Sequence, residues 1–204
     1  QAPQGLMRCV LLDMGGVLVE LCGERPFLEM RGEGVAAEEM WRRWLHSPSV
    51  RAHETGRMDT PTFAEEAVRE FGLSAGPEEF LEHFRGWLAG PFAGAHELLD
   101  ELAARHRTAI LTNISAVHWP IAESYGLFDR VERVFASYRM GAIKPDRDYF
   151  ELALAELGAT PAEAVFFDDN VVNVEGARAC GLEAHVVRGV DETRSRLRDL
   201  GLLG

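Results

Sequence analysis

Five short apolar runs, separated by stretches with helical character, limit most strongly what this chain can fold into. The runs are Cys9 to Leu12, Ala109 to Leu111, Val134 to Ala136, Ala164 to Phe167, and Ala184 to Val187. Unbroken apolar runs of this length are typical of strands that are covered on both faces, as in a parallel sheet. The sequence therefore predicts five strands, enough for one buried parallel sheet.

Helical signals lie between these runs. The segment from Ala95 to Ala103 carries apolar residues at helical spacing, and Thr160, Pro161 and Glu163 match a helix cap, a first-turn proline and a capping-box acid. Strands that alternate with helices predict an α/β fold with a doubly wound, Rossmann-like parallel sheet. Ligands bind beyond the carboxyl ends of the strands of such a sheet, so polar residues that end an apolar run become candidates for function.

The interval from about Leu21 to Gly90 breaks the alternation, and we predict that it is helical throughout. It holds three apolar stripes at helical spacing: Met40, Trp41, Trp44 and Leu45; Phe63, Ala67, Val68 and Phe71; and Phe80, Leu81, Phe84, Trp87 and Leu88. Two helix starts are indicated by a first-turn proline, at Thr60-Pro61 and Gly76-Pro77. A helical insertion after the first strand cannot join the sheet. We therefore predict a small cap of residues 21–90, with the aromatic stripes as its interior, over a core of residues 1–20 and 91–204.

Composition limits the partners of the protein. The 204 residues are 47% hydrophobic and 26% charged, which suits one α/β domain with an insertion and excludes a disordered chain. The net charge of -12 argues against nucleic acid or an anionic membrane surface as the main partner, because both would repel it. A small anionic substrate remains compatible with a locally positive pocket. No feature of the sequence fixes an oligomeric state.

The cysteines and the apolar stretches bear on location. Cys9, Cys22 and Cys180 show no paired spacing, so we expect a reducing compartment rather than a disulfide framework. No apolar stretch approaches the roughly 20 residues of a membrane span, and the first residues do not resemble a secretory leader. These features predict a cytoplasmic protein.

Two residue types are rare in this chain. Lys144 is the only lysine among 21 basic residues, and the only asparagines are Asn113, Asn170 and Asn173. A drift toward arginine replaces lysine wherever the two are exchangeable, but they are not exchangeable where a compact ammonium must fit among several oxygens. These four positions are therefore candidates for function.

Four segments place polar residues directly after apolar ones, and these polar residues could act together on a phosphate group. The segments are Leu11-Leu12-Asp13-Met14-Gly15-Gly16-Val17, Ile110-Leu111-Thr112-Asn113, Gly141-Ala142-Ile143-Lys144-Pro145, and Phe166-Phe167-Asp168-Asp169-Asn170 with Asn173 beyond it. Each alone has an ordinary explanation as a turn or a helix cap. Together they supply a nucleophile, phosphate donors that include the backbone N–H groups of Gly15 and Gly16, one positive charge and a carboxylate pair, all at one sheet edge.

These segments, in this order, resemble the motifs of the haloacid dehalogenase superfamily, in the phosphatase-like branch with a helical cap. The resemblance extends from about Cys9 to Val187. It implies that Asp13 attacks phosphorus to form an aspartyl-phosphate. It also implies that Thr112 and Asn113 hold the phosphoryl oxygens, and that Lys144 neutralises charge on the nucleophile and the phosphate.

The resemblance further implies a magnesium site. Its ligands would be the carboxylates of Asp13 and Asp169 and the backbone carbonyl of Gly15, with Asp168 and Asn173 in the surrounding shell. Oxygen ligands and retained water suit Mg²⁺. Members that cleave carbon–halogen bonds lack a metal and typically carry serines at the positions of the acid pair, so Asp168 and Asp169 favour phosphate over halide. We therefore expect a magnesium-dependent phosphatase of a small phosphorylated metabolite.

The chain departs from the family pattern at Gly15, where the usual phosphatase has a second aspartate that acts as general acid and base. Such a group contributes typically about 10² to 10⁴ in rate. Three interpretations follow: the leaving group needs little protonation, as in an anomeric sugar phosphate or an acyl phosphate; Glu20 or Glu54 supplies the proton; or the chain is a catalytically weak phosphate-binding or regulatory protein. Phosphonatase-like chemistry is set aside, because it needs a cap lysine and the predicted cap contains none.

Overall fold

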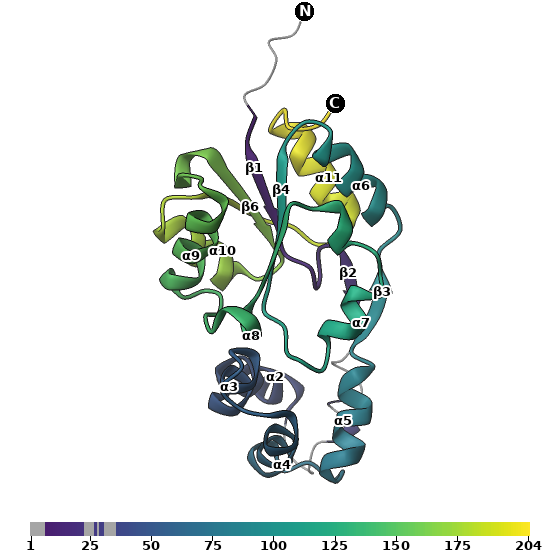
Figure 1. Cartoon of the computed structure of the whole chain (residues 1–204). Helices are drawn as coiled ribbons and strands as arrows, with labels where there is room; N and C mark the ends of the chain where they lie inside the picture. Colours follow the sequence, from purple (N-terminus) through teal and green to yellow (C-terminus); the bar gives the residue numbers. More distant parts are fainter. Residues whose placement is uncertain (1–6, 23–26, 28, 31–35) are drawn as a thin grey trace, which may run out of the picture.

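The computed structural model of the chain describes residues 7–22, 27, 29–30 and 36–204. All five apolar runs form strands of one parallel sheet, with the order β5-β4-β1-β6-β7 (Figure 1). Their bounds are β1 Cys9–Leu12, β4 Arg107–Thr112, β5 Arg133–Ala136, β6 Ala164–Asp168 and β7 Glu183–Val186. The predicted fold class is confirmed, and β1 lies at the centre of the sheet.

Helices cover both faces of this sheet (Figure 1). Helices α6 (Ala95–Ala103) and α11 (Gly189–Asp199) lie on one face, and α9 (Arg147–Leu157) and α10 (Val171–Ala179) lie on the other. Shorter elements complete the connections: α7 Trp119–Glu123, η1 Phe128–Arg130, α8 Ser137–Met140 and η2 Pro161–Glu163.

Strand β1 shows why its sequence is apolar throughout. Val10 and Leu12 pack into the apolar cluster on the α6 and α11 face, whereas Cys9 and Leu11 pack into the cluster on the α9 and α10 face. Because successive side chains point to opposite faces and both faces are covered, no position in the strand tolerates a polar residue. The first polar side chain, that of Asp13, comes where the strand ends.

The predicted helical insertion is wrong at its two ends. Residues Val19–Leu21 (β2) and Leu88–Pro91 (β3) form a two-stranded antiparallel ribbon, which connects the core to the cap. Segments of three or four residues are too short to show a period, so the sequence did not reveal them. The predicted boundaries after residues 20 and 90 fall inside this ribbon. The capping box at Thr160 is present, but it begins only the single turn η2.

The cap consists of helices α2 (Ala37–His46), α3 (Pro48–Glu54), α4 (Thr60–Phe71) and α5 (Pro77–Arg85) within the described residues. Both helix starts marked by a proline are confirmed. Aromatic side chains form the interior, with Trp44 6% exposed, Phe63 and Phe80 fully buried and Phe84 3% exposed. Leu45 is an exception to its stripe, because it is 57% exposed. The side chain of Trp41 lies outside the described part of the structure.

Several contacts seat the cap on the core. His118 Nε2 lies 2.5 Å from the carbonyl oxygen of Phe84, and Arg57 donates to the carbonyl of Gly141 at 3.3 Å. Gly56, with φ of +73°, lies so close to the carbonyl of Tyr138 that a side chain at this position would collide with it. The cap is thus held over the carboxyl ends of the strands.

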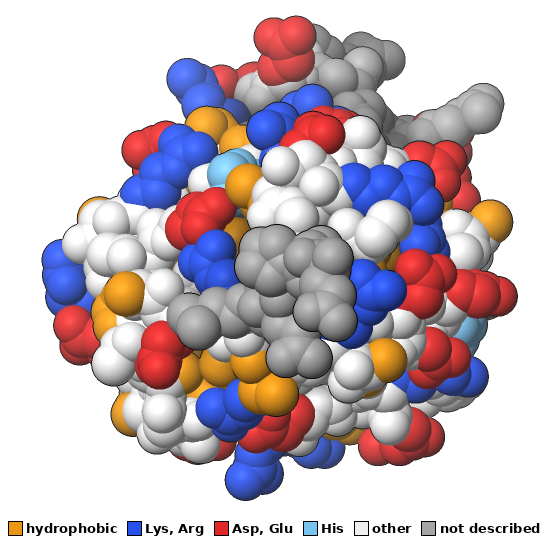
Figure 2. All heavy atoms as spheres, turned by 90° about the horizontal axis from the view of Figure 1, so that it is seen from above, with side chains coloured by type: hydrophobic (Ala, Val, Ile, Leu, Met, Phe, Trp, Pro, Cys, Tyr) orange, Lys and Arg blue, Asp and Glu red, His pale blue; other side chains and the backbone are white. Residues whose placement is uncertain are grey.

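The end of the core remote from the cap carries a mixed surface. Acidic and basic side chains are interspersed over this face (Figure 2). Among the described residues, no helix has the length and apolar character needed to cross a membrane.

The buried histidine of the cap predicts a pH-dependent stability. His53 is 2% exposed and stacks on Phe63 with 4.0 Å between ring centroids, and burial lowers the pKa of its imidazole to about 4. The unfolded chain therefore binds this proton more readily, so stability is lost as the pH falls through the window from 6.5 to 4. Between pH ~7.5 and pH ~5, the free energy of unfolding of the wild type should fall by about 2 kcal/mol more than that of His53→Gln, measured by chemical denaturation. The exposed His83→Gln control should lose as much as the wild type; an equal loss in His53→Gln would contradict the assignment.

Candidate active site

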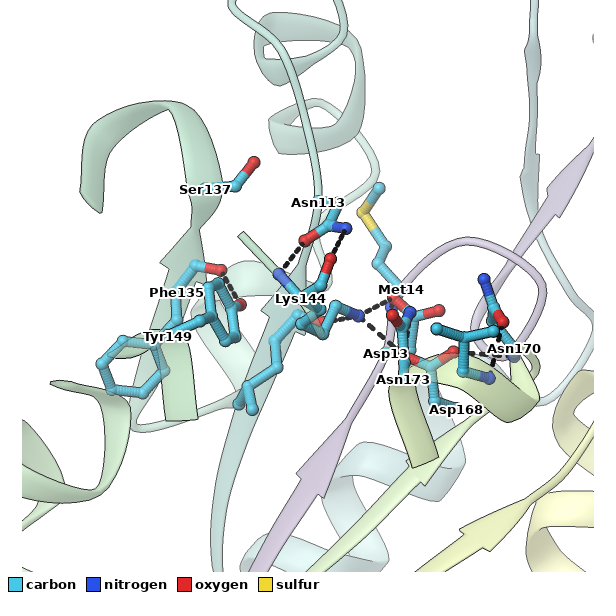
Figure 3. Close-up of polar contacts among 12 residues, drawn as sticks. Asp13, Met14, Asn113, Phe135, Ser137, Lys144, Tyr149, Asp168, Asn170 and Asn173 are labelled. Carbon is cyan, nitrogen blue, oxygen red and sulfur yellow. Dashed lines mark hydrogen bonds and ion pairs between the residues drawn. The ribbon is translucent and has the colours of Figure 1, made fainter. Parts of the chain in front are cut away.

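Four chain segments bring polar side chains together beneath the cap (Figure 3). Asp13 follows β1, Thr112 ends β4, and Asp168 ends β6. Lys144 comes from the loop between α8 and α9 and reaches the same point, within hydrogen-bonding distance of both aspartates. The carboxyl ends of neighbouring parallel strands meet at one edge, which is why residues so distant in sequence converge.

The ammonium of Lys144 lies at the centre of this arrangement. Its Nζ donates to Asp13 Oδ1 at 2.9 Å, to the carbonyl oxygen of Leu111 at 2.8 Å and to Asp168 Oδ2 at 2.8 Å. Its side chain is 1% exposed. Burial by itself lowers the pKa of the lysine, but the carboxylates of Asp13 and Asp168 outweigh that effect and hold the pKa above its usual value. Lys144 is therefore a permanent positive charge with all three protons engaged.

Asn113 fixes the backbone from which Lys144 projects. Its Nδ2 donates to the carbonyl of Lys144 at 3.0 Å, and its Oδ1 accepts from the N–H of Lys144 at 2.9 Å (Figure 3). The carboxamide is thus already engaged at both ends. Phosphate binding by Asn113 stays a prediction, and the backbone N–H is the group left for it. The hydroxyl of Thr112 makes no hydrogen bond with any residue that the structure describes, so it is open to a ligand.

Asp168 is saturated by protein donors. Besides Lys144, its oxygens accept from the N–H of Asn170 at 2.8 Å and from Asn173 Nδ2 at 3.1 Å (Figure 3). The side chain is fully buried. Asn170 in turn accepts from the N–H of Val172 and caps α10. Asp168 therefore orients Lys144 and anchors the start of α10. Its place around the metal, rather than on it, stays a prediction.

Three carboxylates form a cluster suited to a divalent cation. Asp13, Asp168 and Asp169 offer oxygens that all lie within 4.8 Å of one another. Burial raises the pKa of Asp13 well above its usual value, with a further rise from the neighbouring charge of Asp168, and burial and Asp168 raise the pKa of Asp169 in the same way. Lys144 supplies only one compensating charge. The donor set and the excess negative charge fit Mg²⁺.

The two glycines after Asp13 have different tasks. A side chain at Gly16, where φ is +80°, would collide with the carboxylate of Asp169, so this position brings Asp169 against the loop. The N–H of Gly16 already donates to the carbonyl of Val19 at 2.8 Å. Phosphate binding by Gly16 stays a prediction that requires this bond to be shared. Neither the N–H nor the carbonyl of Gly15 makes a hydrogen bond within the described residues, so both remain open to the predicted phosphate and metal.

A cleft between core and cap covers this cluster. It has a volume of about 820 Å³ and is lined from below by Asp13, Thr112 and Lys144. The cap contributes mainly apolar groups, which are Trp44, Leu45, Val50, Phe84 and Trp87. Sequence reasoning assigned all of these residues except Val50 to the cap interior, because helical spacing does not tell which edge of an apolar side chain faces a cleft.

From sequence alone, the cap residues that could contact a substrate are Arg51, His53, Arg57 and Trp87, and the alternative acids are Glu20 and Glu54. The structure places these six residues in different surroundings. Arg51, Trp87 and Glu54 line the cleft. His53 is buried inside the cap, and Arg57 bonds to the core backbone. Glu20 is an exposed residue of β2 and does not line the cleft.

The fold and the cluster define a class of hydrolase. A family model described as haloacid dehalogenase-like hydrolase matches residues 7–181. The chain belongs to this family of haloacid dehalogenase-like hydrolases.

Relatives of the chain include phosphatases. It is 29% identical to phosphatase MT3486 of Mycobacterium tuberculosis, over 96% of this chain and 94% of that protein. It is 27% identical to the sesquiterpene phosphatase astK of Aspergillus oryzae, over 86% of this chain and 87% of that one. A crystal structure of a haloacid dehalogenase family enzyme from Bacteroides thetaiotaomicron, in complex with magnesium and inorganic phosphate, has the same fold, with a TM-score of 0.73, 21% identity, and coverage of 90% of this chain and 95% of that one.

The position of Lys144 yields a test of why this chain keeps a lysine. Three acceptors surround one nitrogen, so the larger planar guanidinium of Lys144→Arg cannot satisfy them without displacing Asp13 or Asp168. We expect a loss of about 3 kcal/mol in the free energy of unfolding, measured by urea denaturation. Arg69→Lys, at an exposed ion pair of the cap, should change it by less than about 0.5 kcal/mol. Equal stability of Lys144→Arg and wild type would refute the fit of the ammonium.

Proposed function

We propose that this protein is a magnesium-dependent phosphatase that acts through an aspartyl-phosphate on Asp13. The observation that carries the proposal is the carboxylate of Asp13, held 2.9 Å from a buried ammonium and beside two further carboxylates on the floor of a covered cleft. The phosphatases among its relatives support the same reaction class.

Asp13 has the orientation that a nucleophile needs. Its Oδ1 accepts from Lys144 at 2.9 Å and from the N–H of Met14 at 2.8 Å, and neither of these donors bonds to Oδ2. One oxygen is therefore fixed and the other is available to attack phosphorus. Lys144 keeps Asp13 ionised during the attack, and the hydroxyl of Thr112 and the N–H of Gly15 donate to the phosphoryl oxygens.

When bound, Mg²⁺ would supply positive charge that offsets the carboxylate cluster and stabilises the charge of the transferred phosphoryl group. Its protein ligands would be Asp13, Asp169 and the carbonyl of Gly15, while Asp168, already saturated by donors, would orient the others. The acid pair and this set of metal ligands favour phosphoryl transfer over cleavage of a carbon–halogen bond.

The cleft favours a substrate whose organic part is at least partly apolar. Of the polar groups on its cap side, Ser47 donates to Glu70 and Arg51 pairs with Asp146, which leaves Glu54 and the exposed His46; His118, on the core side, bonds to the carbonyl of Phe84. A polyol would find few open partners there, and unpaired hydroxyls are costly to bury. Among phosphorylated metabolites, we therefore propose an apolar phosphomonoester ahead of a sugar phosphate.

Removal of the nucleophile or of the metal tests the reaction. Wild-type protein with Mg²⁺ should hydrolyse 4-nitrophenyl phosphate, and Asp13→Asn or chelation with EDTA should reduce the rate by at least about 10³. Asp146→Asn, a matched change at the rim, should leave the rate within a few fold.

Equal rates for Asp13→Asn and wild type would contradict the nucleophile. A wild type that binds phosphate in calorimetry yet hydrolyses nothing would indicate a phosphate-binding or regulatory protein instead.

A pair of substrates tests the organic part. Geranyl monophosphate should show a kcat/KM at least about tenfold above that of a pentitol phosphate, because each buried methylene contributes about 0.8 kcal/mol. Leu45→Ser, in the cleft wall, should reduce the difference in kcat/KM between the two substrates, whereas Leu152→Ser, at another exposed leucine, on α9, should not. A preference for the pentitol phosphate would favour a sugar-phosphate substrate.

A further inference from the structure

The loop after Asp13 has no group that can protonate a leaving oxygen. Gly15 has no side chain, and the nearest atoms to a side chain placed there would be Cδ1 and Cδ2 of Leu21, at 3.2 Å. The space beside Gly15 is thus taken by an apolar side chain. A proton for an alkoxide leaving group has to come from another wall of the cleft.

Glu54 is the acid that the cap brings into this cleft. It is the last residue of α3 and lines the same cavity as Asp13, Thr112 and Lys144. The chain just after it is fixed on two sides: Thr55 Oγ1 donates back to the carbonyl of Arg51 in α3 at 2.8 Å, and Gly56 lies against the carbonyl of Tyr138 in the core. The position of Glu54 over the strand ends is therefore fixed by contacts of its neighbours and not by its own carboxyl group.

The carboxyl group of Glu54 makes no hydrogen bond or ion pair with any residue in the described part of the chain. Its side chain keeps partial access to solvent, yet the walls of the cleft surround it. Burial raises its pKa to about 7, against the opposing attraction of Lys144. A partly dehydrated carboxyl with no partner costs stability, and such groups gather at catalytic sites.

Other ionisable groups that line this cleft are Asp13, His46, Arg51, His118, Lys144, Asp146, Asp169 and Arg188. Arg51 is paired with Asp146, and the three protons of Lys144 are engaged with the core. His118 bonds to the cap backbone. His46, also on the cap wall, is an exposed residue at the end of α2. Among the described residues, Glu54 is therefore the one acidic side chain on the cap wall, and its proton is not committed elsewhere.

We propose that Glu54 is the general acid and base of this site, acting from the cap in place of the aspartate absent at position 15. The inference rests on the proposed phosphatase function and deepens it. It also widens the range of substrates, because alkyl phosphates with poor leaving groups become substrates.

The proton balance closes over two steps. In the first, Asp13 Oδ2 forms a bond to phosphorus, the bond from phosphorus to the leaving oxygen breaks, and protonated Glu54 gives its proton to that oxygen. In the second, water attacks phosphorus, its proton passes to the Glu54 carboxylate, and the bond to Asp13 breaks with the electron pair returning to Asp13. Alcohol and phosphate leave, and Glu54 ends protonated as it began.

The test compares Glu54→Gln with wild type on two substrates of similar size, 4-nitrophenyl phosphate and phenethyl phosphate. Single-turnover release of phenethanol should fall by about 10² or more, because its alkoxide needs a proton. Release of nitrophenolate in the first turnover should fall by less than about tenfold, since that anion leaves unaided. Glu65→Gln, at an exposed acid of α4, is the matched control and should change neither rate.

Three further measurements separate proton transfer from a structural role. With 4-nitrophenyl phosphate, Glu54→Gln should release a burst of about one equivalent and accumulate phosphorylated protein by intact mass, because the second step lacks its base. The wild-type kcat/KM for phenethyl phosphate should fall as the pH rises through about 7, where Glu54 loses its proton, and Glu54→Gln should lack this limb. Glu54→Gln should also melt about 2–4 °C higher at pH ~8, because it removes an unpaired carboxylate.

Two outcomes would overturn the inference alone while the phosphatase function stands. In both, the wild type is active and its activity depends on Asp13. In the first, Glu54→Gln leaves the rates for both substrates unchanged; in the second, Glu54→Gln lowers both rates equally and shows no burst. A wild type that hydrolyses neither substrate, and does not differ from Asp13→Asn, would overturn the proposed function and the role of Glu54 with it.

Discussion

The buried ammonium of Lys144 is the interaction on which the rest of the site depends. One nitrogen binds the end of β1 through Asp13, the end of β4 through the carbonyl of Leu111, and the end of β6 through Asp168. Burying such a charge is favourable only when its partners satisfy every proton, and here all three protons have an acceptor. The lysine therefore joins the ends of three strands and also places a positive charge beside Asp13, the proposed nucleophile. An arginine could supply the charge but not the compact geometry.

The same interaction leaves the site short of positive charge. Asp13, Asp168 and Asp169 lie close together and share one cation from the protein. Carboxylates in such a cluster take up protons unless a metal neutralises them, which is the direction of the raised pKa values of Asp13 and Asp169. The proposed magnesium dependence is thus supported by the charge balance of the described residues as well as by family resemblance.

The sequence was sufficient for much of this site because its residues sit where regular elements end. Asp13, Thr112 and Asp168 each follow an apolar run, and parallel strands bring such ends together whatever the lengths of the connections. The rarity of lysine and asparagine added Lys144, Asn113 and Asn173. The sequence could not predict which groups form hydrogen bonds with each other. Asn113 bonds to the backbone of Lys144, and the N–H of Gly16 donates to the carbonyl of Val19. Both bonds depend on loop geometry, which leaves no periodic signal in the sequence.

The cap was harder to interpret, for a related physical reason. Helical spacing predicted that its apolar stripes form its interior, yet Leu45, a member of one stripe, lies on the cleft wall. Strands β2 and β3 could not be predicted, because segments of three or four residues show no period. Glu54 was indistinguishable in sequence from a solvated acid, because its environment is created by the core surface that faces it.

If Glu54 carries the proton, acid catalysis is available only while the cap is seated, since the cap holds the acid and the core holds the proposed nucleophile. An aspartate at position 15 would act whether the cap were closed or open. Moving the acid to the cap therefore couples proton transfer to exclusion of water, and leaves the space beside Gly15 to the apolar side chain of Leu21.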